Sequence, residues 1–227
     1  MNLCFDFDGP IIDVSERYYR AYLDSLKDIV VNKNEILTKE DFWKLKQNKV
    51  SELELGIISG LSFSNAAKSA DLRKDLTFQS SYFSFDKLFD DVIKIFEHLN
   101  SKKITFFIVT LRRKKQLSQA VKSFKLDKYI SAEHLFSIAD EHKLTNDIQE
   151  KYILLVNAVN RFELNPLDTW IIGDTETDIH AGRLARFGKV IGINRGLRSK
   201  ELLELLKPSY LINNFTDLAS LIMSPAR

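Results

Sequence analysis

Apolar residues recur along this chain at two different spacings, and the pattern changes near residue 86. Beyond that point, stretches with helical periodicity alternate with short apolar runs rich in Ile, Val and Phe, which predict buried strands. We expect helices at residues 87–99, 115–124, 147–164 and 175–187, and strands at 104–110, 135–138, 169–172 and 189–193. This alternation predicts an α/β fold: a Rossmann-like parallel sheet with helices on both faces.

Residues 14–85 show helical periodicity without any buried-strand run. Helices are expected over 16–26, 50–61 and 65–83, and a further one starting at 38–41, with breaks at 32–34, Gly56, Gly60 and 62–64. We expect the aromatic and leucine side chains of this segment to pack on one another and form a hydrophobic core within the segment. The pattern predicts a small all-helical unit, residues 14–85, inserted after the first strand of a domain formed by residues 1–13 and 86–227.

Two acids close the first apolar run of the chain. The run begins at Leu3 and predicts a buried strand, and it ends with Asp6 and Asp8, which a pleated strand would place on the same side. A buried carboxylate needs a cation or strong donors, because unpaired burial costs several kcal/mol. From this stretch alone, a metal or phosphate site and a simple Asp-Gly turn at Gly9 are equally compatible.

Polar residues also follow two later strands. The strand at 169–172 is followed by Gly173 and Asp174, with Asp178 in the first turn of the next helix, and the strand at 104–110 ends with the hydroxyl of Thr110. In an open parallel sheet these strand ends lie at one edge, where ligands bind. Carboxylates from two strands are therefore expected to point to one place.

These three stretches resemble the haloacid dehalogenase-like hydrolase superfamily. Its first motif is similar to Asp6-Phe7-Asp8-Gly9, its second to Thr110, and its fourth to residues 173–178. Residues 193–202 and 210–212 look like the closing segment of the branch that includes phosphoglycolate phosphatases and β-phosphoglucomutases. The resemblance covers essentially the whole chain and implies a catalytic core with a helical cap at 14–85.

The resemblance also implies a role for each site residue. Asp6 would be the nucleophile that forms an aspartyl phosphate, and Asp8 the general acid and then the general base. Mg²⁺ would be held by Asp6, Asp174 and the main-chain carbonyl of Asp8, and Asp178 would either bind the ion directly or orient the groups that do. The substrate would be contacted by Thr110, Leu111, Arg112 and a lysine that neutralises the phosphoryl oxygens.

Lys151 is the predicted lysine, although the Lys-Pro pair that often marks the third motif of the family is absent. Some relatives instead carry the lysine just inside the helix before the fourth motif, which fits Lys151. Lys151, Leu155, Ala158 and Phe162 also form one helical stripe that should pack on the sheet. The alternative is Lys143, which lies in a polar run with no apolar stripe to orient it.

Composition limits the classes of partner and location. The chain has 227 residues, 44% hydrophobic and 28% charged, and a net charge of +2, so nothing favours nucleic acid or an anionic membrane surface. The single cysteine, Cys4, excludes an internal disulfide and is compatible with a reducing compartment. No apolar run approaches the roughly 20 residues that span a bilayer, and the start is unlike a signal peptide. A cytoplasmic location is expected, and the oligomeric state is left open.

The presence of Asp8 favours a reaction at phosphorus over dehalogenation, because the dehalogenases of the superfamily lack a carboxyl group at this position. The prediction is Mg²⁺-dependent hydrolysis of a small phosphomonoester, with phosphoglycolate as a first guess that rests on resemblance alone. A phosphomutase of the β-phosphoglucomutase type would use the same groups. The alternative from a different class is a catalytically silent binding protein with this fold.

Overall fold

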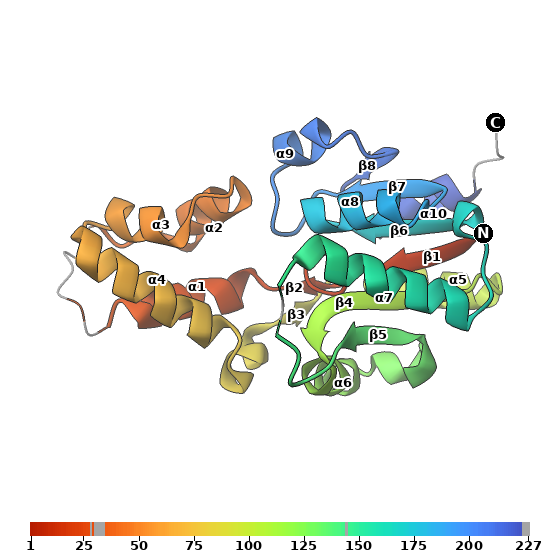
Figure 1. The fold of residues 1–227 in the computed structure, drawn as a ribbon, viewed down its shortest axis with the longest axis horizontal. Coiled ribbons are helices and arrows are strands. Elements are labelled where there is room, and N and C mark those ends of the chain that lie inside the picture. The colour runs from red at the N-terminus through yellow and green to blue at the C-terminus, as the bar shows by residue number, and fades with distance from the viewer. Residues whose placement is uncertain (28, 30–34, 144, 224–227) are drawn as a thin grey trace.

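The computed structural model of this chain describes residues 1–27, 29, 35–143 and 145–223. Within these residues, six parallel strands form one sheet in the order β5-β4-β1-β6-β7-β8. The strands are β1 (Asn2–Phe5), β4 (Phe106–Arg113), β5 (Leu135–Ile138), β6 (Thr169–Gly173), β7 (Lys189–Ile193) and β8 (Tyr210–Ile212). The strand nearest the N-terminus thus lies inside the sheet, between β4 and β6 (Figure 1).

Helices cover both faces of the sheet because the strands are apolar on both sides. On β1, Leu3 and Phe5 belong to a core shared with helices α5, α6 and α10, whereas Cys4 points to the opposite core, shared with α7 and α8. The helices are α5 (Val92–Ser101), α6 (Lys114–Ser123), α7 (Asp147–Arg161), α8 (Glu176–Leu184), α9 (Lys200–Leu205) and α10 (Phe215–Met223). The predicted Rossmann-like α/β fold is confirmed.

Between residues 13 and 87, the described part of the chain forms four α-helices that lie beyond one end of the sheet strands, at the left of Figure 1. They are α1 (Ser15–Ser25), α2 (Lys39–Gln47), α3 (Glu52–Ile58) and α4 (Phe63–Thr77). Their buried side chains, among them Tyr22, Phe42 and Leu55, form a cluster separate from the two cores of the sheet. The expectation that the segment has its own core is confirmed. The predicted break at 32–34 lies outside the described residues.

Two short antiparallel strands, β2 (Ile12–Asp13) and β3 (Lys87–Leu88), lie where the chain leaves and rejoins the sheet. The predicted helix from residue 87 is therefore wrong at its start: Lys87 pairs with Asp13 and Leu88 with Ile12, and α5 begins only at Val92. The predicted helix 65–83 is also too long. It ends at Thr77, and a 3₁₀ turn, η2 (Ser80–Phe85), follows, whose Ser, Tyr and Phe residues are weaker helix formers.

Strand β4 continues past Thr110 to Arg113, so the predicted strand end at Thr110 is wrong. The pairing of β4 with β5 shifts register between Thr110 and Arg113, and this irregularity redirects the residues that follow Thr110. Three further 3₁₀ turns complete the described elements: η3 (Leu126–Lys128), η4 (Ala132–His134) and η5 (Pro166–Asp168). None of the helices in the described part of the chain is both long and apolar enough to cross a membrane.

Candidate active site

Three carboxylates meet at the carboxyl edge of the sheet, as the sequence predicts for Asp6, Asp174 and Asp178. Asp6 follows β1, and its N–H donates to the carbonyl of Ile172 in β6 over 2.9 Å, which holds the two strand ends together. Asp174 follows β6, and Asp178 lies in the first turn of α8. One oxygen of each carboxylate lies within 4.8 Å of the others, and all three residues are buried.

A glycine allows the backbone to pack directly on this acidic cluster. Gly9 has φ +100°, a conformation that side-chain-bearing residues rarely adopt, and a Cβ placed there would lie 2.2 Å from Cγ of Asp174. The turn after Asp8 therefore requires glycine for two reasons, conformation and space. This explains physically why an Asp-Gly pair follows the first strand.

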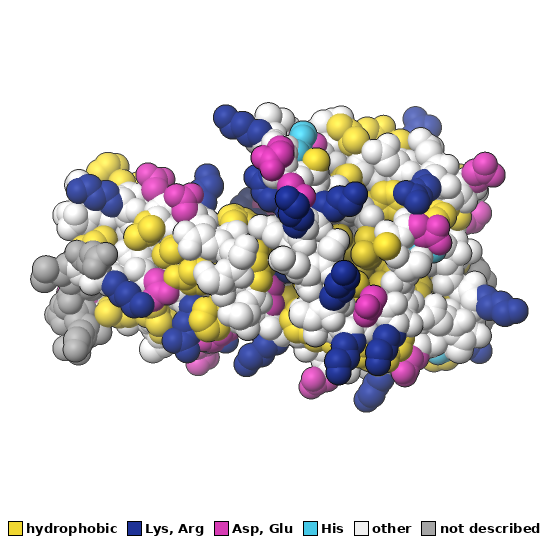
Figure 2. Space-filling view, turned by 90° about the horizontal axis from the view of Figure 1, so that it is seen from below, with side chains coloured by type: hydrophobic (Ala, Val, Ile, Leu, Met, Phe, Trp, Pro, Cys, Tyr) yellow, Lys and Arg dark blue, Asp and Glu magenta, His cyan; other side chains and the backbone are white. Residues whose placement is uncertain are grey.

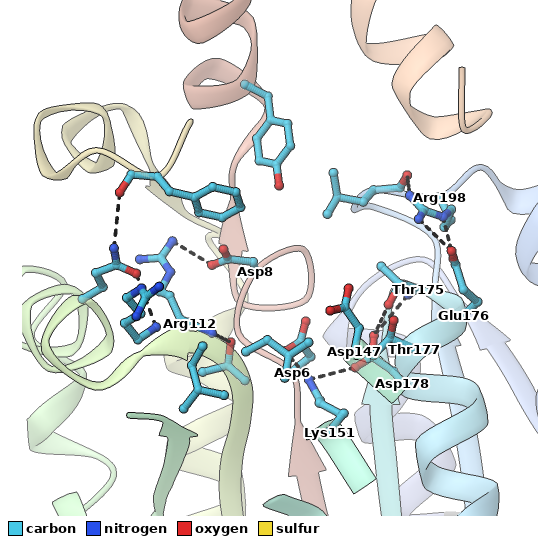
Figure 3. Close-up of a pocket in the computed structure, with 18 residues that line it drawn as sticks. Asp6, Asp8, Arg112, Asp147, Lys151, Thr175, Glu176, Thr177, Asp178 and Arg198 are labelled. Atoms are coloured by element: carbon cyan, nitrogen blue, oxygen red, sulfur yellow. Dashed lines mark hydrogen bonds and ion pairs between the residues drawn. The ribbon is translucent and has the colours of Figure 1, made fainter. Parts of the chain in front are cut away.

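Lys151 is the cation of the cluster. Its Nζ lies 2.5 Å from Oδ1 of Asp6 and 2.9 Å from Oδ1 of Asp178, and the residue is 1% exposed. Burial alone would lower the pKa of Lys151, but the carboxylates of Asp178 and Asp6 outweigh burial and raise this pKa above its ordinary value. Lys143 is exposed on the loop before α7. Figure 3 shows Lys151 reaching from α7 towards Asp6 and Asp178.

The cluster contains three carboxylates, and among the described residues Lys151 is the cation that pairs with two of them. Oδ2 of Asp174 accepts from the N–H of Leu197 over 2.6 Å, but its buried Oδ1 has no hydrogen-bond partner among the described residues. Burial raises the pKa of Asp174 well above its ordinary value and that of Asp6 to about 7. The electrostatic cost of this arrangement would be relieved by a further cation. A divalent ion that prefers oxygen ligands fits the three carboxylates and the unpartnered oxygen of Asp174.

Asp8 lies apart from this cluster, contrary to the expectation that it shares a strand face with Asp6. Strand β1 ends at Phe5, and the chain then turns, so that Asp8 points towards Arg112 while Asp6 points towards Lys151 (Figure 3). Burial would raise the pKa of Asp8, but the guanidinium groups of Arg112 and Arg17 lower it below its ordinary value. Asp8 is therefore held as a carboxylate in this arrangement.

Asp8 belongs to a network of four charged residues. Arg17 lies 2.8 Å from Oδ2 of Asp8 and Arg112 lies 2.7 Å from Oδ1, and both arginines also contact Asp86, at 3.1 and 2.5 Å. Both guanidinium groups also lie over the ring of Phe83, 4.6 and 4.7 Å from its centroid. Arg17 and Asp86 were not predicted as site residues, because nothing in the sequence distinguishes them from the other charged residues. Their roles depend on how α1 and the chain before β3 pack on the sheet.

A cavity of about 430 Å³ opens beside these groups. The part of the chain that contains the sheet and its flanking helices contributes to the lining, and so does the helical segment, through Tyr18 and Phe78. From the first part come Asp6, Asp8, Thr110, Leu111, Arg112, Arg113, Lys151 and Asp178. The Thr110 hydroxyl accepts from the N–H of Arg112 over 3.1 Å. Away from the cavity, Lys, Arg, Asp and Glu side chains are interspersed over the face seen in Figure 2.

The fold and the site define an α/β protein with a carboxylate-rich site at the carboxyl edge of its sheet. The chain belongs to the haloacid dehalogenase-like hydrolase family, whose model matches residues 3–191. Pyrophosphatase PpaX of Anoxybacillus flavithermus is 21% identical over 229 residues, covering 97% of this chain and 95% of that protein.

Solved structures share the same fold over almost the entire chain. A haloacid dehalogenase-like family hydrolase from Streptococcus pneumoniae superposes with a TM-score of 0.72 and 18% identity, covering 98% of both chains. A predicted phosphoglycolate phosphatase from Haemophilus somnus superposes with a TM-score of 0.68 and 16% identity, covering 98% of this chain and 97% of the other. The family suggested by the three sequence motifs is thus confirmed.

Proposed function

We propose that this protein is a phosphatase that hydrolyses a small phosphorylated metabolite with the help of Mg²⁺ and through an aspartyl-phosphate intermediate. The observation that carries this proposal is the meeting of Asp6, Lys151, Asp174 and Asp178 at one edge of the sheet, beside a cavity that also contains Thr110. A family model that matches most of the chain supports the same reading.

The metal would be held by the carboxylates of Asp6, Asp174 and Asp178, with the main-chain carbonyl of Asp8 as the further ligand that the family resemblance implies. The unpartnered Oδ1 of Asp174 supports this assignment, because a buried oxygen without a donor is costly. When bound, the ion offsets the negative charge that otherwise keeps an anionic nucleophile away from a phosphoryl group.

The chain's own residues would divide the chemistry as follows. An oxygen of Asp6 attacks phosphorus, the bond to the leaving oxygen breaks, and water then cleaves the resulting aspartyl phosphate. Lys151 and the hydroxyl of Thr110 stabilise the phosphoryl oxygens. Asp8 removes the proton from the attacking water, a role that suits its carboxylate form between Arg17 and Arg112. In the first step, Asp8 would donate its carboxyl proton to the leaving oxygen, as the family resemblance implies; Arg17 and Arg112 oppose this protonated form because they lower the pKa of Asp8.

The helical segment, residues 14–85, would act as a cap that closes the cavity and selects the substrate. Tyr18 and Phe78 support this assignment, because they line the same cavity as the acidic cluster. The catalytic core would then comprise residues 1–13 and 86–227. Enclosure of this kind excludes water from the reacting groups.

Inorganic pyrophosphate is a second candidate substrate. The relative in Anoxybacillus is a pyrophosphatase. In addition, Arg113 lines the cavity, and within the described residues it forms no ion pair with an acid, whereas Arg112 and Arg198 are already paired. A free guanidinium group suits a second anionic group on the substrate, which pyrophosphate and phosphoglycolate both carry.

The test is phosphate release from 4-nitrophenyl phosphate, phosphoglycolate and pyrophosphate by the purified protein, with Mg²⁺ and with EDTA. We expect release only with Mg²⁺, and a preference for the two substrates with a second anionic group. Asp6→Asn provides the background. Release no faster than this background for every substrate would contradict the proposed activity and favour a silent binding protein.

A further inference from the structure

The C-terminal end of α2 docks on the loop between β7 and α9. The side chain of Gln47 donates from Nε2 to the carbonyl of Gly196 over 2.9 Å, and the main-chain carbonyl of Gln47 accepts from the N–H of Ser199 over 3.1 Å. Gln47 thus bonds to both ends of the short stretch 196–199. These are direct contacts between the helical segment and the part of the chain that contains the sheet.

The same stretch touches the acidic cluster. The N–H of Leu197 donates to Oδ2 of Asp174 over 2.6 Å. At Gly196, a Cβ would lie 1.9 Å from that oxygen, so the backbone packs directly against the carboxylate. This bond fixes one oxygen of Asp174, and the other oxygen is the buried, unpartnered one. The position of residues 196–198 therefore sets the orientation of Asp174.

A charged contact connects the same two regions. Glu176, at the start of α8, accepts two bonds from Arg198, at 2.6 and 2.9 Å, and also pairs with Lys49, just after α2, at 2.9 Å. Glu176 therefore holds Arg198 and the end of α2 in one place. Its contacts reinforce those of Gln47 and do not involve Asp174 itself.

We infer that Gln47 is a positioning residue for the metal site: by docking on residues 196–199 it fixes the Leu197 amide, which orients the carboxylate of Asp174 for a cation. The inference rests on the proposed function, because it concerns the metal that the three carboxylates would hold. Coupling between two sites is reciprocal, so docking of α2 strengthens metal binding and metal binding strengthens docking.

The first test measures Mn²⁺ binding by electron paramagnetic resonance, without substrate, in the full-length protein. Gln47→Ala removes the bond to Gly196 but no metal ligand, and we expect the dissociation constant for Mn²⁺ to rise about threefold to tenfold, as for loss of one hydrogen bond. Asn48→Ala is the matched control, because among the described residues the Asn48 side chain bonds only to the carbonyl of Lys44 in α2, at 2.8 Å. It should bind Mn²⁺ like the parent.

The outcomes separate the inference from the proposed function. If the parent binds Mn²⁺ and Gln47→Ala binds it equally well, the positioning role is refuted while the metal site stands. If the parent binds no Mn²⁺, both are refuted. Circular dichroism and the melting temperature of the metal-free variants show whether Gln47→Ala keeps the parent fold. If it unfolds, Gln47→Glu, which places a carboxylate against the Gly196 carbonyl, replaces it with the same expected loss of affinity.

The second test uses the reciprocal effect. Mg²⁺ should slow hydrogen exchange at the amide of Ser199, which donates to Gln47, in the parent protein. The slowing should be reduced in Gln47→Ala and unchanged in Asn48→Ala. Equal protection of this amide with and without Mg²⁺ in the parent would refute the coupling.

Discussion

Replacement of Lys151 by Met tests the cluster most directly. Met has a similar length and lacks the charge, so it should keep the contact of α7 with the sheet, where Leu155 and Ala158 are fully buried. The substitution removes the cation that lies 2.5 Å from Asp6 and 2.9 Å from Asp178. Three carboxylates then face one another without a lysine.

We expect Lys151→Met to lower both the rate of turnover and the stability of the fold. Turnover should fall at least about a hundredfold, the scale for loss of one preorganised group that stabilises charge in a transition state. The free energy of unfolding of the metal-free protein should fall by about 3–5 kcal/mol, because removing one partner of a buried ion pair leaves uncompensated charge. For a chain of this size that corresponds to a fall in melting temperature of roughly 6–20 °C. The stability difference should shrink as the pH falls, since Asp6, whose pKa burial raises to about 7, becomes protonated.

The assay compares phosphate release and thermal unfolding of the parent, Lys151→Met and Lys143→Met, the last being a control at an exposed lysine. Lys143→Met should behave like the parent in both measurements. If Lys151→Met retains nearly full activity while Lys143→Met is inactive, the phosphate-neutralising role belongs to Lys143. If both retain activity, no lysine of this loop and helix has that role.

The remaining predictions concern the carboxylates. Asp6→Asn should abolish phosphate release with little change in melting temperature; more than a few per cent activity, after mass spectrometry has excluded deamidation, would contradict its role as nucleophile. Asp174→Ala should remove the response to Mg²⁺ in activity and in melting temperature, whereas Glu176→Ala should keep the chemistry and weaken docking of α2; equal losses would show that the turn at 174–178 is misassigned. The stabilisation by Mg²⁺ relative to EDTA should grow as the pH rises from about 4 to about 7, because burial raises the pKa of Asp6 from 3.8 to about 7 and the metal-free fold loses stability as this group ionises. A constant difference in melting temperature across that range would contradict this.

The α/β fold could be predicted because the strands are apolar on both faces and alternate with helices. Residues such as Phe107 and Ile171 lie in continuous apolar runs that only a sheet covered on both sides can bury. The limits of β5 and β7 follow from the same signal and match the expected ranges. The short strands β2 and β3 could not be predicted, because two-residue pairs have no periodicity and depend on where the chain re-enters the sheet.

The candidate site was predictable only where the chemistry lies next to a strand end. Asp6 and Asp174 are brought together by neighbouring parallel strands, and Lys151 by a helical stripe. Arg17 and Gln47 lie in helices of the inserted segment, and their contacts depend on how that segment packs against the sheet. Sequence periodicity shows which face of a helix is apolar, but it does not show which part of the molecule that face packs against. The direction of Asp8 was also mispredicted, because the strand ends at Phe5 and the turn that follows depends on Gly9 and its contact with Asp174.

The central place of β1 has a consequence for synthesis of the protein. Cys4 pairs with Phe107 on one side and with Ile171 on the other, so β1 lacks its second neighbour until more than 160 further residues have been added. At translation rates of about 5–20 residues per second, this delay lasts roughly 10 to 30 s. The helical segment can bury Tyr22, Phe42 and Leu55 among themselves during that time, because its contacts are local in sequence. The ring partners of Phe5, by contrast, are Phe96, Phe106 and Phe215, which are all added much later, so β1 is a part of the nascent chain that a ribosome-bound chaperone would have to protect.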